Sequence, residues 1–94
     1  QILSKETVAL MSKNHVGALL GPAGGFGLGF GMIRDAQIHP GPGSTGQLYC
    51  GGYFRTHFFI DPTINLIAIF MTQKLPHGDD YAIALNQYVY AALQ

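Results

Sequence analysis

The sequence predicts an α+β fold: an antiparallel β-sheet of three to four strands, flanked by a short N-terminal helix and a C-terminal helix. Two observations predict this class. Strand-like segments fill the middle of the chain and are joined by short connections rich in glycine and proline, which favours antiparallel neighbours. Helical start signals lie near the two ends. The 94 residues are enough for one domain only, so residues 1–94 are read as a single unit.

The first element is a short helix that follows Ser4. Ser4 has the side chain of an N-cap, and Glu6 and Thr7 fill the first helical turn. Residues 14–17 end this helix, and residues 21–25 form a loop because glycine and proline dominate them.

Residues 26–34 are predicted to form one strand, because apolar residues alternate strictly with glycine there. One face of this strand carries Phe26, Leu28, Phe30 and Met32, and the other carries Gly27, Gly29 and Gly31. Three glycines in a strand weaken it, so their spacing indicates a place where another backbone approaches closely. Residues 35–46 follow as a loop rich in glycine and proline.

Two further strands are predicted at residues 47–50 and 56–60, joined through the glycines at 51 and 52. The sequence Asp61-Pro62-Thr63 makes the next turn, because proline fixes φ and aspartate bonds to the backbone two residues on. Residues 64–71 are apolar on both faces, which predicts a central strand covered on both faces, with helices on at least one side.

The last element is a helix from Asp80 to about Leu93, with Asp79 as its N-cap. A helical stripe of apolar side chains is expected to pack on the sheet: Tyr81, Leu85, Tyr88, Val89 and Ala92.

The composition predicts a partner. The chain is 48% hydrophobic and only 11% charged, against a usual charged fraction of about 25%. A domain of this size leaves much of its surface outside the core, and ten charged residues cover little of that surface. We therefore expect the chain to fold against another copy of itself or against the remainder of a larger protein.

Charge and cysteine content exclude some classes of function. Lysine and arginine together number 5, as do aspartate and glutamate, so there is no basic stripe for a nucleic acid. No apolar stretch is long enough to span a membrane. The single cysteine, Cys50, excludes an internal disulfide and assigns no compartment.

Four segments, in order and over nearly the whole chain, carry a resemblance to a known family. They are Ile2–Met11, Gly25–Phe30, Gly51–Pro62 and Leu66–Gln73. Together they resemble the C-terminal third of the serine β-lactamase-like family, which includes class C β-lactamases, penicillin-binding proteins, and related esterases and D-aminopeptidases. The resemblance implies that residues 1–94 are a C-terminal fragment of a β-lactamase/transpeptidase-like fold, with no cofactor and no metal.

In that family the nucleophile and its lysine are spaced Ser-x-x-Lys, a Tyr-x-Asn element assists proton transfer, and a strand motif of the Lys-Thr-Gly type walls the site. The first two motifs are absent from this chain. Cys50-Gly51-Gly52 resembles the third motif, and the N–H of Tyr53, the next residue, would then face the oxyanion. The resemblance therefore assigns substrate binding to Cys50, Gly51, Gly52 and Tyr53, and no catalytic residue.

Residues 53–55 depart from the family, because Tyr53, Phe54 and Arg55 stand where small residues are common. Bulk at these positions is expected to narrow the pocket. A turn between strands, with no ligand, is the simpler interpretation of residues 50–57 taken alone.

Other interpretations of the reactive residues carry less weight. Cys50 and His57 would face each other across the predicted hairpin as a nucleophile pair, but no third residue orients the histidine. The histidines at 15, 39, 57 and 77 lack metal-ligand spacing, and no Lys-Ser/Thr follows the glycines as a phosphate loop requires.

The leading hypothesis is a fragment of a serine hydrolase for acyl transfer on an amide, β-lactam or ester, inactive as the 94-residue chain alone. Its partner is the remainder of the parent hydrolase. The alternative is a catalytically inert structural module that associates with other copies of itself, because apolar strands with open edges pair readily.

Overall fold

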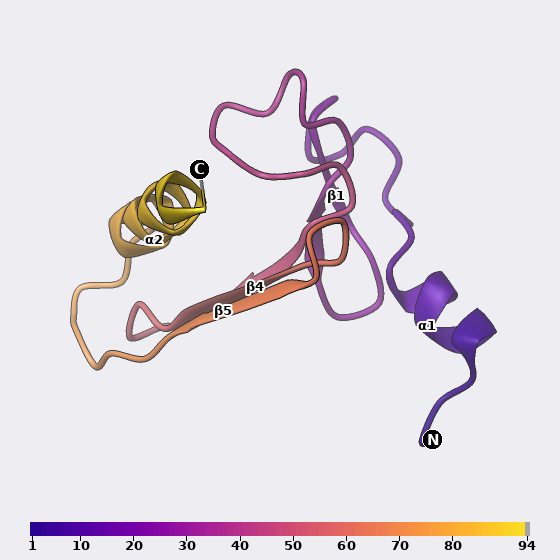
Figure 1. The fold of residues 1–94 in the computed structure, drawn as a ribbon, viewed down its shortest axis with the longest axis horizontal. Coiled ribbons are helices and arrows are strands. Elements are labelled where there is room, and N and C mark those ends of the chain that lie inside the picture. Colours follow the sequence, from indigo (N-terminus) through magenta and orange to yellow (C-terminus); the bar gives the residue numbers. More distant parts are fainter. Residues whose placement is uncertain (94) are drawn as a thin grey trace.

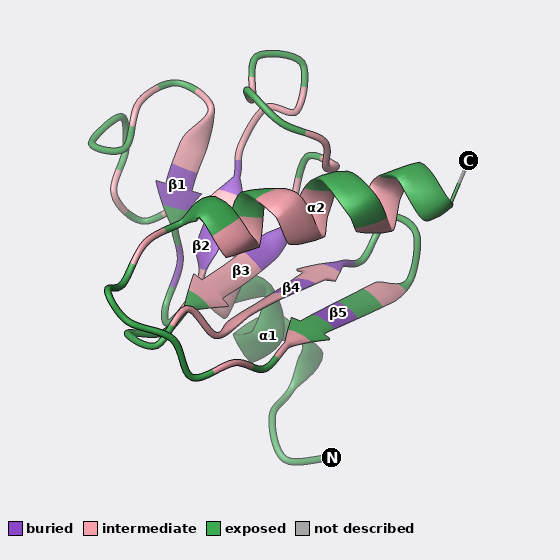
Figure 2. Ribbon diagram, turned by 90° about the vertical axis from the view of Figure 1, so that its left-hand side faces the viewer, coloured by how far each residue is buried: buried purple, intermediate pink, exposed green. Residues whose placement is uncertain are grey.

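The computed structural model describes residues 1–93 as two helices and one five-stranded antiparallel sheet (Figure 1). In chain order the elements are α1 (Lys5–Met11), β1 (Gly24–Phe26), β2 (Gly31–Ile33), β3 (Leu48–Gly51), β4 (His57–Asp61), β5 (Leu66–Phe70) and α2 (Asp80–Ala92). The strands lie side by side in sequence order. Helix α2 crosses one face of the sheet and α1 lies on the other side (Figure 2). The α+β class is confirmed, with five strands where the sequence predicted three to four.

The extra strand arises because residues 26–34 are not one strand. They contain the end of β1, the strand β2 and the turn that joins them, in which the N–H of Gly27 donates to the carbonyl of Phe30 at 2.8 Å and Gly29 has a φ of +112°. Glycine adopts that conformation without strain, so the chain reverses there. Phe26 and Met32, predicted on one face of one strand, consequently lie in different strands.

Two of the glycines do allow a close approach, as their spacing predicts. A Cβ on Gly27 would overlap the backbone carbonyl of Met11, and a Cβ on Gly31 would lie 2.6 Å from the Tyr49 ring. The hairpin therefore packs against the end of α1 and against β3 through positions without side chains.

The hairpin of β3 and β4 agrees with the sequence prediction. The turn at residues 61–63, which follows β4, agrees with it as well. In that turn the Asp61 carboxylate accepts a hydrogen bond from the N–H of Thr63, two residues on, at 3.1 Å. The next strand, β5, differs from its prediction. It is the edge of the sheet in the described chain, with α2 on one face only, and Ile67 and Ile69 are 63% and 67% exposed.

The core lies between the sheet and α2. Phe59 is fully buried on β4 and stacks on Tyr90 of α2, with ring centroids 5.5 Å apart. Phe70 of β5 meets Tyr81 of α2 edge-on at 5.8 Å. The predicted helical stripe is therefore wrong at two positions, because Tyr88 is 76% exposed and Ala92 is exposed.

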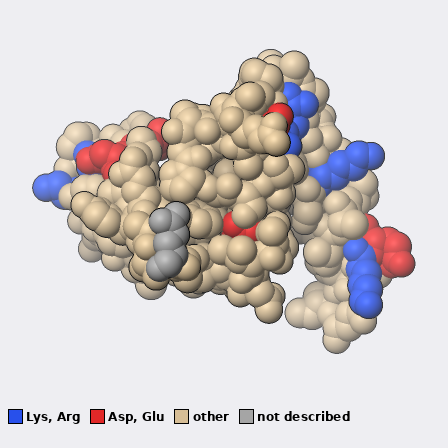
Figure 3. All heavy atoms as spheres, turned by 45° about the horizontal axis from the view of Figure 1, so that its top comes forward, with Lys and Arg blue, Asp and Glu red and all other residues tan. Residues whose placement is uncertain are grey.

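The helix ends differ in how they are held. The Ser4 hydroxyl accepts a hydrogen bond from the N–H of Thr7, as an N-cap does. Asp79 stands at the predicted N-cap position of α2 but makes no side-chain capping bond. Helix α1 has no buried residue, and in the view of Figure 3 charged side chains are few and separated by wide uncharged areas.

Candidate functional site

The end of β3 has a backbone edge that pairs with no neighbouring strand within residues 1–93, where the Gly51 carbonyl accepts a hydrogen bond only from the Cys50 thiol, at 3.7 Å. Strand β2 pairs with β3 only at Leu48 and Tyr49, whereas β4 pairs with β3 as far as Gly51. The N–H of Gly52 donates to the carbonyl of Thr56 at 2.8 Å, on the β4 side. Backbone groups alternate between the two neighbours of an antiparallel strand, so those of Gly51 face the side where β2 has ended.

A tight turn follows and presents the next backbone donor. The N–H of Arg55 donates to the carbonyl of Gly52 at 3.1 Å, and Arg55 adopts a φ of 70°. The N–H of Tyr53 lies inside this turn and has no hydrogen-bond partner within residues 1–93. This N–H is the donor that the family resemblance predicts to face an oxyanion.

Arg55 fixes the turn to the start of α2. Its guanidinium donates to the carbonyl of Pro76 at 2.6 Å and forms an ion pair with the Asp80 carboxylate at 2.6 Å. It also lies 4.7 Å from the centre of the Tyr81 ring, as a cation–π contact. The Arg55 side chain is 13% exposed, so this ion pair is shielded on one side.

A hollow of about 340 Å³ adjoins the turn. It is lined by Gly51, Gly52, Tyr53, Arg55, Thr56, His57, His77, Gly78, Asp79 and Ala82. The Tyr53 ring, which is 67% exposed, stacks on His77 with centroids 5.8 Å apart and meets Phe54 edge-on at 5.4 Å. The Tyr53 side chain thus packs against both Phe54 and His77. These large side chains leave the hollow between the turn and α2 open.

His57 is the titratable group whose ionisation the hollow alters. Burial lowers the pKa of its imidazole below the usual 6.5, and the nearby Asp79 carboxylate opposes this shift without cancelling it. The uncharged imidazole is therefore favoured in the folded chain.

The structure separates Cys50 from His57. Cys50 is opposite Phe58 in the register, and His57 is opposite Gly51. Because successive side chains of a strand point to opposite faces, Cys50 and His57 lie on different faces of the sheet. They do not form a nucleophile pair. Within residues 1–93 no group of three or more histidine, cysteine or acidic side chains is arranged for a metal ion.

Seven residues that line the hollow were not assigned to a site from the sequence: Arg55, Thr56, His57, His77, Gly78, Asp79 and Ala82. His77 and Asp79 reach it from the segment between β5 and α2, more than twenty residues from the turn. No local pattern marks such residues, because only the packing of α2 against the sheet brings them to Gly51. No helix in residues 1–93 is long and apolar enough to cross a membrane.

Comparison with solved structures supports a fragment of a hydrolase. No family model and no curated protein matches the chain. Among solved structures, it is similar to EstCE1, described as a hydrolase with promiscuous acyltransferase activity. The TM-score is 0.83 and the sequence identity is 32%. The likeness covers 95% of this chain but 25% of the EstCE1 chain, so residues 1–94 correspond to about a quarter of that hydrolase.

Proposed function

We propose that the chain forms the strand wall of an acyl-transfer site in a serine β-lactamase-like hydrolase, acting on an amide, β-lactam or ester. The observation that carries the proposal is the unpaired N–H of Tyr53 at the open end of β3. A fixed backbone donor aimed at a developing oxyanion accelerates acyl transfer by about 10²–10³-fold.

The likeness to EstCE1 supports the same class of reaction, since that protein is described as a hydrolase with acyltransferase activity. The sequence resemblance to the serine β-lactamase-like family also supports it, through residues 51–62 and 66–73. The chain contains neither Ser-x-x-Lys nor Tyr-x-Asn. The nucleophile is therefore proposed to lie in another part of the complete protein, which is also the partner of this chain.

The proposed roles differ among the four assigned residues. Gly51 and Gly52 leave room for a substrate to lie along the strand, and Tyr53 supplies the backbone donor. Cys50 has its side chain on the face away from the hollow, and its thiol donates to the Gly51 carbonyl at 3.7 Å, so it acts through that backbone group and does not line the hollow. Arg55 acts on the site indirectly, by holding the turn against α2.

The experiment that tests this proposal is Gly51→Val in the complete protein. A Cβ at Gly51 meets nothing closer than the His57 Nδ1 at 3.7 Å, so the fold accommodates it, but the side chain occupies the proposed substrate space. We expect ester hydrolysis to fall by about 100-fold or more with the Tm unchanged.

The matched control is Gly41→Val, because a Cβ at Gly41 is also uncrowded, with His39 at 3.8 Å, and Gly41 does not line the hollow beside residues 51–53. This variant is expected to keep its activity. Unchanged hydrolysis by Gly51→Val would contradict the proposal.

A second candidate function is favoured by the open edge of β5, where Ile67, Ile69 and Met71 are all more than 60% exposed. Unpaired strand edges with apolar side chains pair readily with other strands. On this account the chain is an inert module that associates with itself. A native mass spectrum separates the two, because the module predicts only multiples of the 10.1 kDa chain and the hydrolase predicts a larger companion polypeptide.

A further inference from the structure

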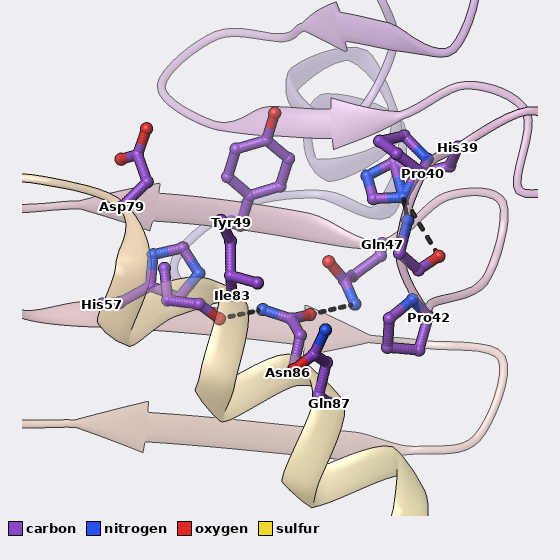
Figure 4. A pocket seen from close by; sticks show the side chains of 12 residues that line it. His39, Pro40, Pro42, Gln47, Tyr49, His57, Asp79, Ile83, Asn86 and Gln87 are labelled. Atoms are coloured by element: carbon purple, nitrogen blue, oxygen red, sulfur yellow. Dashed lines mark hydrogen bonds between the residues drawn. The ribbon is translucent and has the colours of Figure 1, made fainter.

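A second hollow, larger than the candidate site, lies between the loop at residues 39–42, strand β3 and helix α2 (Figure 4). Its volume is about 420 Å³, within the range of small-molecule sites. We call it the loop–helix pocket. It touches the candidate site only through His57, Asp79 and Ala82, and it does not include the backbone edge of residues 51–53.

The walls of the loop–helix pocket are mostly apolar and partly flat. Pro40 and Pro42 close one side, Ile83 of α2 closes another, and Tyr49 of β3 contributes an aromatic ring. The Tyr49 ring is nearly parallel to the His57 imidazole, at an interplanar angle of 30° and a centroid distance of 6.1 Å. Such walls suit a planar ring better than a branched or flexible chain.

One polar group at the base of the pocket lacks a partner. Gln47 is only 2% exposed, and its Nε2 donates to the Tyr90 hydroxyl at 2.7 Å and to the Asn86 Oδ1 at 3.4 Å. These bonds fix the amide, and its Oε1 then accepts no hydrogen bond within residues 1–93 and points into the pocket (Figure 4). Because no buried side-chain oxygen or nitrogen within residues 1–93 lacks a partner, this Oε1 is accessible from the pocket, and a ligand with an N–H or O–H group there can donate to it.

The charge of the pocket excludes one class of ligand. Asp79 is the one acidic lining residue, and no lysine or arginine lines the pocket. Burial lowers the pKa of the lining His57, which favours its uncharged imidazole, and the other lining histidine is His39 of the loop. An anion would approach a carboxylate without a lysine or arginine to pair with, so anionic ligands are disfavoured.

We propose that the loop–helix pocket binds an uncharged planar molecule of one or two rings that carries an N–H or O–H donor. The ring lies against Tyr49 and the two prolines, and the donor bonds to Gln47 Oε1. This site is independent of acyl transfer, since it uses neither the Tyr53 N–H nor the open edge of β3.

The test compares three probes on the complete protein by ligand-observed NMR titration: indole, 1-methylindole and indole-3-carboxylate. Indole has the required ring and donor, and a molecule of this size is expected to bind with a Kd of about 1 mM. 1-Methylindole keeps the ring and loses the donor, so it should bind about five-fold more weakly. Indole-3-carboxylate should not bind, because it is an anion.

Two variants on α2 locate the binding. Ile83→Trp adds bulk to the pocket wall at a position that is 57% exposed, so the fold tolerates it, and it should weaken indole binding by more than about ten-fold. Tyr88→Trp adds bulk at the 76% exposed Tyr88, outside the pocket, and should leave the Kd unchanged.

Three results would overturn the proposal. Equal affinity for indole and 1-methylindole would show that Gln47 accepts no bond from the ligand. An unaltered Kd in Ile83→Trp would place the binding elsewhere. Absence of indole binding at concentrations well above 1 mM would show that the pocket takes no such ring.

Discussion

Among single residues, Asp61 is the buried charge on which the packing of α2 depends. Its carboxylate is fully buried, and it accepts hydrogen bonds from the Ser44 and Tyr90 hydroxyls, both at 2.6 Å, as well as from the N–H of Thr63. A carboxylate is tolerated in the interior when its oxygens accept hydrogen bonds in this way. The sequence predicted the local bond to Thr63, because an aspartate before proline commonly forms it. The partners at 44 and 90 come from distant segments, and no local pattern indicates them.

Tyr90→Phe tests this network. The variant removes one donor to the buried Asp61 and one acceptor for Gln47, so we expect a loss of about 1–3 kcal/mol in the free energy of unfolding at pH 7. The measurement is urea denaturation followed by circular dichroism. An unchanged free energy of unfolding would show that the network adds no stability.

The stability of Tyr90→Phe relative to wild type should also depend on pH in the alkaline range. Burial and the hydrogen bond to Asp61 raise the pKa of Tyr90 to about 12, above the value near 10 of an unfolded tyrosine. Its contribution to stability is complete below pH 10 and is lost as the pH rises from 10 to 12. The difference in stability between wild type and Tyr90→Phe should therefore shrink over that window. A constant difference would contradict the raised pKa.

The pKa of His57 is shifted in the opposite direction from that of Tyr90. Because its folded pKa lies below 6.5, the neutral imidazole stabilises the fold above that pH, and this stability is lost as the pH falls through the folded pKa. An NMR titration of the imidazole should give a midpoint below 6.5. Asp79→Asn removes the opposing charge and should lower the midpoint further. A midpoint that rises in Asp79→Asn would refute this account of the hollow.

At the scale of elements, the packing of α2 is set by which of its side chains meet the sheet. Leu85 is half-buried on the face toward the sheet, and Tyr88 is 76% exposed. Leu85→Ala should cost about 2 kcal/mol in the free energy of unfolding, and Tyr88→Ala should change it by less than about 0.5 kcal/mol. Thermal denaturation of the two variants measures both. Equal losses of unfolding free energy in the two variants would mean that α2 is rotated about its axis relative to the sheet.

The elements that local signals mark were predicted well. Ser4 caps α1, the glycines at 51 and 52 mark the end of β3, and α2 begins at Asp80. The hairpin of β1 and β2 was missed, because residues 26–34 alternate like a strand and only the positive φ of Gly29 reveals the reversal. Periodicity reports which side chains share a face, and it does not report where the backbone turns.

At the scale of the whole molecule, α2 covers one face of the sheet in the described chain, and the other face is exposed at the β5 edge. Helix α2 packs on one face, while Ile67 and Ile69 of β5 are exposed on the other. The sequence predicted both faces of this strand to be covered, because both are apolar. The covering of the second face is proposed to come from the remainder of the hydrolase, since the likeness to EstCE1 spans a quarter of that protein.

A charge on the open face tests this arrangement. Ile69→Lys places an ammonium group on a side chain that is 67% exposed in the described chain, so the sheet and α2 should still form. If the remainder of the protein covers that face, the charge is buried there and the Tm of the complete protein should fall by about 5 °C or more. An unaltered Tm would show that the face stays in water.

The most direct test of the central claim is to trap the acyl-enzyme. The complete protein is treated with a chromogenic short-chain acyl ester, quenched, digested and analysed by peptide mass spectrometry. The account predicts an acyl group on a serine outside residues 1–94, followed three residues later by lysine, and no such adduct in Gly51→Val. An acyl group within residues 1–94, on Ser44 or Cys50 for example, or no acylation at all, would contradict it.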